Sequence, residues 1–300
     1  MKVAYLATSP LGDFGWYYNG YEALKRACAA LPYCEIIGYS ENVAEPEAEP
    51  YLRDYADKGA NLIVAHSYGY WEPAIKVAKD YPNVVFVYPQ GDKDKLAENV
   101  GTYYARAEET YYLAGLMAGM MTKNNKLGFV LPIQTPMVNN ECWGFRQGVA
   151  ASNSNAKISY VVTDSWYDPP KERESALALI DQGADFIAYD ADSTAVVDAV
   201  GERGALVAGV FVDLAYVAPE SVVMSMLWPW DGYFTDTINA VHSGNFEPSI
   251  DLRGIKEGGT DITPFGPMVP QNVKDAVLKA RQDIIDGVLK VEYKEDVCLE

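Results

Sequence analysis

The sequence contains little that could bind a metal ion or build a disulfide framework. Its 300 residues include four cysteines and two histidines, with no CxxC pair and no Cys/His cluster at zinc-ligand spacing. We therefore expect no metal site and no cofactor. Cys28 and Cys34 lie six residues apart and could form a disulfide in an oxidising compartment, but two free thiols are the favoured interpretation.

Long apolar runs and positive charge are also scarce. The longest apolar run, Tyr111–Met121, has eleven residues, whereas a membrane-spanning helix needs about 20. The 24 Lys and Arg residues against 42 Asp and Glu residues leave a net charge of −18. Such a chain repels phosphate groups, so nucleic acids, anionic membranes and free nucleotides are poor partners. The acidity could instead serve solubility alone.

The apolar residues that are present predict a soluble α/β protein. They make up 49% of the chain, against 22% charged residues. Short apolar runs predict strands at Val3–Thr8, Cys34–Tyr39, Asn61–His66, Val84–Tyr88, Leu127–Leu131, Ile158–Thr163, Asp185–Asp190, Leu206–Val212 and Ser221–Trp228. Helical patterns cover Asn19–Leu31, Pro46–Lys58, Pro73–Asp80, Glu108–Met121, Trp230–His242 and Val273–Asp286. Strands alternating with helices indicate parallel sheets.

A shift of 124 residues aligns three of these strands with three others. Lys2–Leu6 falls on Lys126–Val130, and Gly59–Val64 falls on Gly183–Ala188. One constant offset indicates two similar, doubly wound, Rossmann-like lobes. We predict an N-terminal lobe of residues 1–124 and 230–263 and a C-terminal lobe of residues 125–229 and 264–300. The chain would then cross between the lobes near Lys123–Lys126, Trp228–Trp230 and Thr263–Pro267.

Ligands of open parallel sheets bind beyond the carboxyl ends of the strands, so the residues following each strand are the candidate site. In the first lobe these residues are mainly aromatic: Phe14, Trp16, Tyr17, Asn19, Ser67 and Tyr68. The bulk of Phe14 and Trp16 is unsuited to a phosphate-binding loop and suits stacking on a flat ring. The alternative is that these rings only pack between helix and sheet.

In the second lobe the residues after the strands are mostly acidic. The candidates are Trp166, Asp190, Asp192, Asp213 and Trp228. Carboxylates can accept hydrogen bonds from ribose hydroxyls or from ring N–H groups. Asp168 precedes two prolines and is expected to cap a helix instead. For the other residues, capping or packing stays open as the alternative.

Catalytic motifs are not evident, so we expect no enzyme and assign no catalytic residue. There is no GxSxG motif, and His66 has no nucleophile at a suitable spacing. Asp190-Ala191-Asp192 is weakly similar to the calcium loop of nucleoside hydrolases, but Ser9-Pro10-Leu11 stands where such enzymes carry that loop. A nucleoside-processing enzyme is the less favoured alternative.

The order of several segments resembles the BMP family of substrate-binding proteins, the basic membrane lipoproteins of ABC importers. The resemblance rests on Tyr112–Gly119, Lys126–Val130, Gly144–Gly148, Ser165–Pro169, Glu172, Gly183–Ile187, Asp192–Ser193, Asp213, Ala218–Pro219 and Trp228–Trp230. It implies a type I periplasmic-binding fold with a three-strand hinge. It also implies that a purine nucleoside or base is held between two lobes and passed to a membrane permease. Two segments depart from the family pattern, 14–19 and 138–143.

The resemblance and the residues together predict a monomeric, extracytoplasmic receptor, periplasmic or lipid-anchored. No signal peptide precedes the first strand, so the export segment would be absent from this sequence. Trp16 with Phe14 and Trp166 would stack on the base, while Asp190, Asp192 or Asp213 would bind its N–H edge or the ribose. A ligand sensor without transport is the alternative function.

Overall fold

The computed structural model describes residues 1–91 and 93–299, which form two compact units. Unit 1 contains Met1–Ala105 and Pro229–Arg253, and unit 2 contains Arg106–Trp228 and the chain from Gly254 onward. The chain thus passes between the units three times. The passage at Trp228–Pro229 lies where the sequence predicts one, whereas the other two passages come about 20 and 10 residues earlier than predicted.

The earlier passages have a structural reason. No sequence pattern indicated strand β5, Val100–Ala105, which adds a strand to the first sheet and ends the first of the two segments of unit 1. The helix that follows, α4, Glu108–Met121, belongs to unit 2 and not to the first lobe. The strand β11, Ile250–Arg253, returns to pair with β5 in unit 1, and the chain after it joins unit 2.

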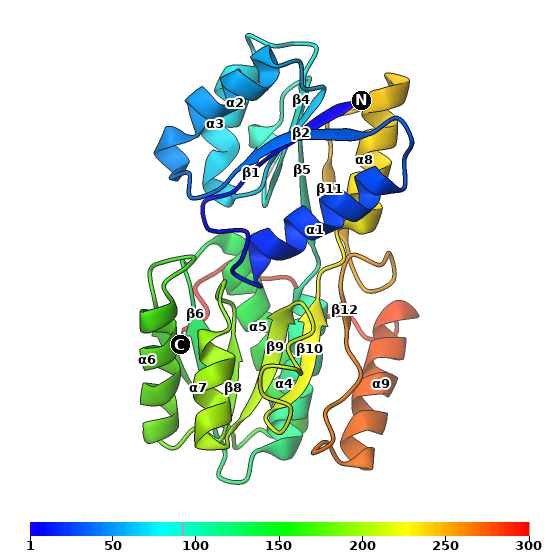
Figure 1. Ribbon diagram of the computed structural model, residues 1–300. Helices are drawn as coiled ribbons and strands as arrows, with labels where there is room; N and C mark the ends of the chain where they lie inside the picture. The colour runs from blue at the N-terminus through cyan, green and yellow to red at the C-terminus, as the bar shows by residue number, and fades with distance from the viewer. Residues whose placement is uncertain (92, 300) are drawn as a thin grey trace. The chain divides into compact units, whose positions relative to one another are not determined.

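Unit 1 is a six-stranded parallel sheet in the order β11-β5-β4-β3-β1-β2. The remaining strands are β1 Lys2–Leu6, β2 Glu35–Ser40, β3 Leu62–Ala65 and β4 Val85–Pro89. The helices are α1 Trp16–Ala29, α2 Ala48–Asp57, α3 Trp71–Ala78 and α8 Asp231–Ser243. In Figure 1, α2 and α3 lie side by side, as do α1 and α8.

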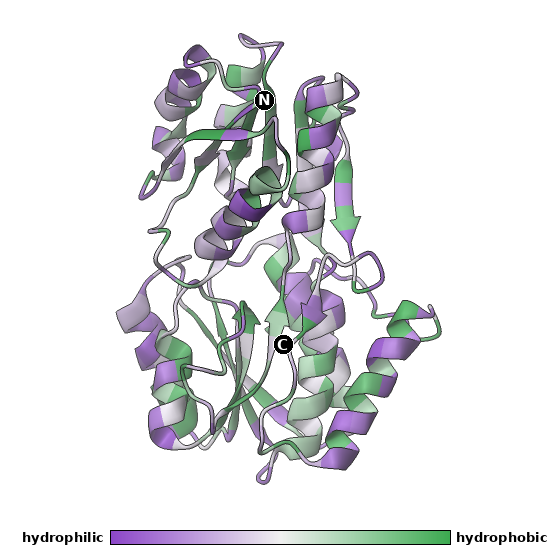
Figure 2. Cartoon of the chain, turned by 45° about the vertical axis from the view of Figure 1, so that its right-hand side comes forward, coloured by the Kyte–Doolittle hydropathy of each residue, from purple (hydrophilic) through white to green (hydrophobic). Residues whose placement is uncertain are grey.

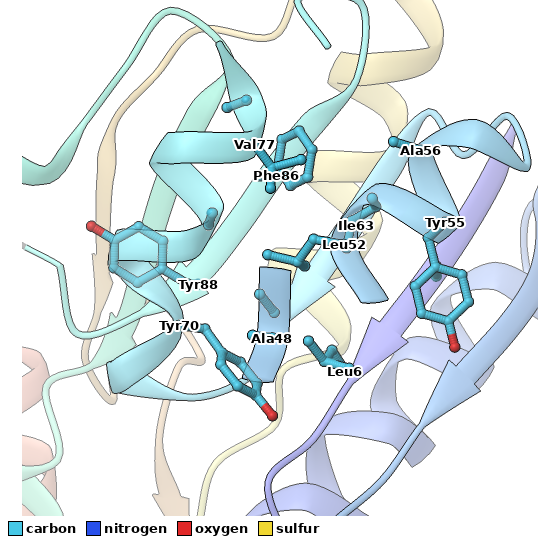
Figure 3. Close-up of a cluster of buried hydrophobic side chains, with 14 of the residues drawn as sticks. Leu6, Ala48, Leu52, Tyr55, Ala56, Ile63, Tyr70, Val77, Phe86 and Tyr88 are labelled. Carbon is cyan, nitrogen blue, oxygen red and sulfur yellow. The ribbon is translucent and has the colours of Figure 1, made fainter. Parts of the chain in front are cut away.

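One face of the unit 1 sheet is buried beneath α2 and α3. Leu6 and Ile63 from the strands meet Leu52 of α2 and Val77 of α3 in a cluster of buried side chains (Figure 3). The strands β3 and β4 are buried along their whole length, as expected for parallel strands covered on both faces. The tyrosines of the cluster keep their hydroxyls bonded; Tyr70 donates to the carbonyl of Val43 at 2.6 Å.

Unit 2 repeats the same sheet, in the order β12-β10-β9-β8-β6-β7. Its strands are β6 Lys126–Leu131, β7 Lys157–Val162, β8 Phe186–Tyr189, β9 Leu206–Phe211, β10 Val222–Leu227 and β12 Asp261–Ile262. Its helices are α4, α5 Pro136–Ser152, α6 Pro169–Asp181, α7 Ala195–Arg203 and α9 Gln271–Ile285. Strands related by the 124-residue shift, such as β1 and β6, hold equivalent places, which confirms two similar lobes. Among the strands of residues 1–91 and 93–299, the short β12 alone pairs antiparallel, with β10.

The helices α4 and α5 pack with their backbones almost in contact. A Cβ atom added at Gly115 would lie 2.1 Å from the carbonyl oxygen of Phe145, and one at Gly148 would lie 2.0 Å from that of Tyr112. A Cβ atom at Gly144 would lie 2.5 Å from the carbonyl oxygen of Glu108, and one at Gly119 would lie 2.1 Å from the hydroxyl oxygen of Ser152. The glycines are therefore spaced four residues apart on both helices because any side chain there would push the helices apart.

All four cysteines form disulfides, so the prediction of free thiols is wrong. Cys28 near the end of α1 is bonded to Cys34 just before β2, because the turn between them brings their Cα atoms to 5.1 Å. Cys142 of α5 is bonded to Cys298, which lies 156 residues further on. The second bond was not foreseen, since only the tertiary fold brings the C-terminal segment back to α5.

The helices carry both polar and apolar residues (Figure 2). Among residues 1–91 and 93–299, we find no helix with the length and apolar character that a bilayer crossing requires.

Candidate functional site

Asp190 follows β8 at the carboxyl edge of the unit 2 sheet and is 5% exposed. Its carboxyl group is hydrogen-bonded to Glu141 of α5 and to Tyr111 of α4, and Glu141 is fully buried. The Tyr111 hydroxyl also donates to the carbonyl of Tyr189 at 2.9 Å. Three segments that are distant in the sequence thus meet at this carboxyl group.

Burial raises the pKa of Asp190 to about 6, although the hydrogen bonds to Glu141 and Tyr111 act to lower it. Two carboxylates at hydrogen-bonding distance in a buried place cannot both stay charged, so Asp190 and Glu141 share a proton. Because the shared proton lies between the two carboxyl groups, their other oxygens remain acceptors.

Asp192 and Trp166 lie on adjoining segments of the same edge. The backbone N–H of Asp192 donates to the carbonyl of Trp166 at 3.2 Å. Asp192 is buried, and Trp166 is half-buried in the loop after β7. The backbones of two loops that carry residues of the predicted set are thus joined at this edge.

Asp168 caps α6, as the sequence predicts. Its side chain accepts from the backbone N–H of Lys171 at 3.1 Å, and its own N–H donates to Glu172 at 2.9 Å. Glu172 also accepts from the hydroxyl of Ser193 in the loop after β8. Burial raises the pKa of Glu172, which these hydrogen bonds oppose. The cap therefore connects α6 to the Asp192 loop.

The last two predicted residues of unit 2 are engaged elsewhere. Asp213 is exposed, and its side chain accepts from the N–H of Ala215 at 3.0 Å, which closes a local turn. Trp228 is almost fully buried and meets the ring of Phe211 edge-on, with the centroids 4.7 Å apart. Their contribution to a ligand site stays a prediction.

The N-terminal turn of α4 adds two further buried carboxyl groups. Glu108 accepts from the Asn140 amide at 2.9 Å and from Arg106 at 3.2 Å. Glu109 accepts from the backbone N–H of Ile255 at 2.8 Å. Burial raises the pKa of both glutamates, and the charge of Arg106 opposes it. This end of unit 2 is therefore strongly acidic.

In unit 1, Trp16 is packed against neighbouring rings. It is 6% exposed, and its ring stacks on His66 with the centroids 4.6 Å apart. Its indole N–H donates to the carbonyl of His66 at 3.0 Å, and Trp230 of α8 meets the ring edge-on. This arrangement is typical of a core residue, and a stacking role for Trp16 stays a prediction.

His66 is the centre of this aromatic cluster. Its Nδ1 atom is hydrogen-bonded to the hydroxyl of Tyr103, whereas its buried Nε2 atom has no hydrogen-bond partner among the residues that the structure describes. A Cβ atom at Gly20 would lie 2.3 Å from that Nε2 atom. Burial lowers the pKa of His66 to about 3, so the ring is neutral at physiological pH.

The other predicted residues of unit 1 are divided between surface and interior. Phe14 is 46% exposed and adopts a positive φ of 59°, which a phenylalanine rarely does. Tyr17 and Asn19 are buried in the first turn of α1. Ser67 donates to Glu45 at 2.8 Å, and Lys95 lies over the ring of Tyr68. Phe14 and Tyr68 are thus the more accessible aromatic candidates.

The sequence analysis missed Glu141, Tyr111 and the Glu108–Asn140 contact. The signal was present, because the loop after Leu131 leads directly into the polar sequence Asn139-Asn140-Glu141. That loop follows a strand just as the other candidate loops do, but residues 138–143 were noted only as a departure from the family pattern and not as candidate site residues. Tyr111 and Glu108 lie on a helix that was assigned to the other lobe, so their position could not be foreseen.

Comparisons with known proteins agree with this architecture. The model of the Bmp family, described as ABC transporter substrate-binding protein PnrA-like, matches residues 1–295. A purine-binding protein of Brucella abortus is 34% identical over 96% of this chain and 82% of its own length. A protein of Haloferax volcanii, named as a candidate glucose-binding protein of an ABC transporter, is 32% identical over 97% of this chain and 74% of its own length.

A solved structure shows the same fold. The ABC transporter solute-binding protein from Aeropyrum pernix superposes with a TM-score of 0.87 and 21% identity, over 99% of this chain and 94% of its own. Its likeness and the two sheet orders establish the type I periplasmic-binding fold. On the evidence of its sequence and its fold, this chain belongs to the Bmp family of PnrA-like ABC transporter substrate-binding proteins.

Proposed function

We propose that this protein binds a purine nucleoside or a purine base and delivers it to an ABC permease. The observation that carries the proposal is that a loop bearing an indole is bonded through its backbone to a loop of buried acids at one edge of the unit 2 sheet: Trp166, Asp192 and the Asp190–Glu141 pair. The purine-binding relative from Brucella supports the same ligand class.

The acids fit an uncharged ring better than a phosphate. A purine edge carries N–H donors, and the carboxyl oxygens at this edge can accept hydrogen bonds from them. A phosphate group would meet like charge at this edge, where Asp190 and Asp192 are buried. Nucleosides and bases are therefore favoured over nucleotides.

The aromatic side chains supply the other part of recognition. Stacking of a base on an aromatic ring contributes roughly 1–3 kcal/mol. Trp166 is half-buried, and Phe14 is exposed, so both can offer a ring face to a ligand. Trp16 contributes most directly to the core of unit 1, where its ring already stacks on His66.

The cellular setting follows from the family and the disulfides. Substrate-binding proteins of ABC importers act outside the cytoplasm, and two disulfides persist where the environment is oxidising. We propose an extracytoplasmic, monomeric receptor whose second partner is the membrane permease. It would carry its ligand unchanged, without catalysis.

Calorimetry with the purified chain tests the ligand class. Inosine, adenosine and adenine should bind at least tenfold more tightly than AMP, and glucose should not bind. Binding of glucose without binding of any purine would replace the purine proposal by the sugar specificity that the Haloferax relative's name carries.

A substitution tests the site itself. Trp166→Ala should weaken inosine binding at least tenfold, about 1.4 kcal/mol. Tyr51→Ala, which alters an exposed ring on α2 of unit 1, serves as the control and should leave the affinity unchanged. Equal affinities of wild type and Trp166→Ala would remove Trp166 from the site.

A further inference from the structure

The C-terminal segment Glu292–Leu299, here named the C-terminal strap, lies along one face of α5. Its backbone is bonded to side chains of the helix at residues 292, 294, 295, 296 and 298. Four amide, indole and guanidinium donors of α5 reach strap carbonyls: Gln147 to Glu292 at 2.9 Å, Asn139 to Glu295 at 3.0 Å, Trp143 to Asp296 at 2.9 Å and Arg146 to Cys298 at 2.7 Å.

Two strap N–H groups donate in the opposite direction, to the side-chain oxygens of Gln147 and Asn140, each at 2.9 Å. The α5 residues involved are three or four apart, so they form one face of the helix. The Cys142–Cys298 disulfide closes the same face covalently. The strap therefore fixes how α5 is rotated about its own axis.

The strapped face leads directly to the candidate site. The Asn140 side chain accepts from the N–H of Lys294 and donates to Glu108, both at 2.9 Å. The next residue, Glu141, forms the carboxyl pair with Asp190. Any rotation of the first turns of α5 would move both contacts at once.

The α5 sequence explains why an external support is needed. Asn139 and Asn140 are poor helix formers, and both are buried, so their amides need hydrogen-bond partners. The strap supplies a carbonyl to Asn139 and an N–H to Asn140. Without the strap, these amides would draw in water, and the first turns of α5 would open.

We propose that the C-terminal strap is a positioning element for the ligand site, holding Asn140 and Glu141 of α5 in place through the Cys142–Cys298 bond. This proposal rests on the proposed function, because it takes the Asp190–Glu141 pair as part of the ligand site. The strap's backbone hydrogen bonds and its disulfide reach α5, and it acts on the site by holding that helix.

The test compares the two disulfides. In Cys142→Ser/Cys298→Ser, amide hydrogen exchange should speed up across residues 136–148, and inosine affinity measured by calorimetry should fall at least fivefold. The matched control, Cys28→Ser/Cys34→Ser, breaks a disulfide of unit 1 and should change neither quantity. Unchanged exchange across residues 136–148, or faster exchange with full inosine affinity, would overturn the positioning role.

A second variant covers the case in which the first does not fold, and the exchange measurement covers the case in which no purine binds. If Cys142→Ser/Cys298→Ser does not fold, Trp143→Phe/Arg146→Met removes two strap hydrogen bonds and leaves the disulfide intact. It should show the same two effects at smaller size, and their absence would contradict the proposal. If the wild type binds no purine, the proposed function fails, whereas the exchange measurement still reports on the strap.

Discussion

Gly148 of α5 lies so close to Tyr112 of α4 that a methyl group on the glycine would stand 2.0 Å from the tyrosine's carbonyl oxygen. Its Cβ would also lie 2.6 Å from the backbone nitrogen of Leu116. Because both neighbours are backbone atoms of a helix, neither can turn aside. The contact makes residue 148 a test of how tightly these two helices must pack.

Gly148→Ala should therefore destabilise the protein by about 2–3 kcal/mol, the usual range for overpacking. The higher intrinsic helix propensity of alanine would offset no more than about 1 kcal/mol. Urea unfolding measures the change. Gly12→Ala is the matched control, since a Cβ there meets nothing within 4 Å, and its unfolding free energy should stay within about 0.5 kcal/mol of wild type. Equal stability of the two variants would contradict the close packing.

His66 should make stability depend on pH. Its folded pKa of about 3 lies below the ordinary value of about 6.5. The unfolded chain then binds a proton that the folded chain does not, so the stability contributed by the neutral ring is complete above pH 6.5 and is lost as pH falls toward 3.

Comparison with His66→Gln isolates that contribution. The stability advantage of wild type over the variant should shrink by about 2 kcal/mol between pH 7 and pH 5, as measured by urea unfolding at both pH values. An advantage that stays constant over this interval would show that His66 titrates normally in the folded protein.

Asp190 should make stability depend on pH in the direction opposite to His66. Its folded pKa of about 6 lies above its ordinary value, so the folded state takes up a proton first as the pH falls. The cost of the buried charge is present above pH 6 and is relieved toward pH 4. Asp190→Asn, which is neutral throughout, should be more stable than wild type at pH 8 by on the order of 2 kcal/mol.

At pH 4.5 the stability difference between Asp190→Asn and wild type should fall to about a third of its value at pH 8. Thermal or urea unfolding at both pH values gives the answer. A stability difference of equal size at both pH values would mean that the carboxyl group of Asp190 does not change its protonation state in this interval.

The two disulfides should differ in their contribution to stability. Cys142–Cys298 spans 156 residues and Cys28–Cys34 spans six. Loop-closure entropy gives about 5 kcal/mol for the long loop and about 2.5 kcal/mol for the short one. Unfolding of the two double Cys→Ser variants should show the larger loss for the pair 142 and 298. A larger stability loss for the pair 28 and 34 would mean that the disulfides act mainly on the folded state and not on the unfolded chain.

Sequence patterns sufficed for most of the sheets because buried parallel strands are continuous apolar runs. The run Asn61–His66 is one example, and β3 occupies its centre. β5 was not predicted because Val100–Ala105 has the sequence Val-Gly-Thr-Tyr-Tyr-Ala, in which glycine and threonine interrupt the apolar run. Because β5 was not predicted, the first lobe boundary was placed about 20 residues too late.

The site was foreseen only in part, for a physical reason. Asp190 and Asp192 follow a strand, so their place at the sheet edge could be predicted from the strand alone. Glu141 and Tyr111 reach Asp190 from helices, and no local pattern fixes the rotation of a helix against a sheet. The glycines that fix it, Gly115 and Gly148, were noted only as family segments.

The return of β11 to β5 has a consequence for dissecting this protein. Because unit 1 takes its edge strand and α8 from residues 229–253, no single uninterrupted stretch of the gene encodes it. A fragment stopping at Ala105 would leave the β5 edge bare and prone to self-association. Isolating unit 1 would require a fusion that joins its two pieces through a new linker.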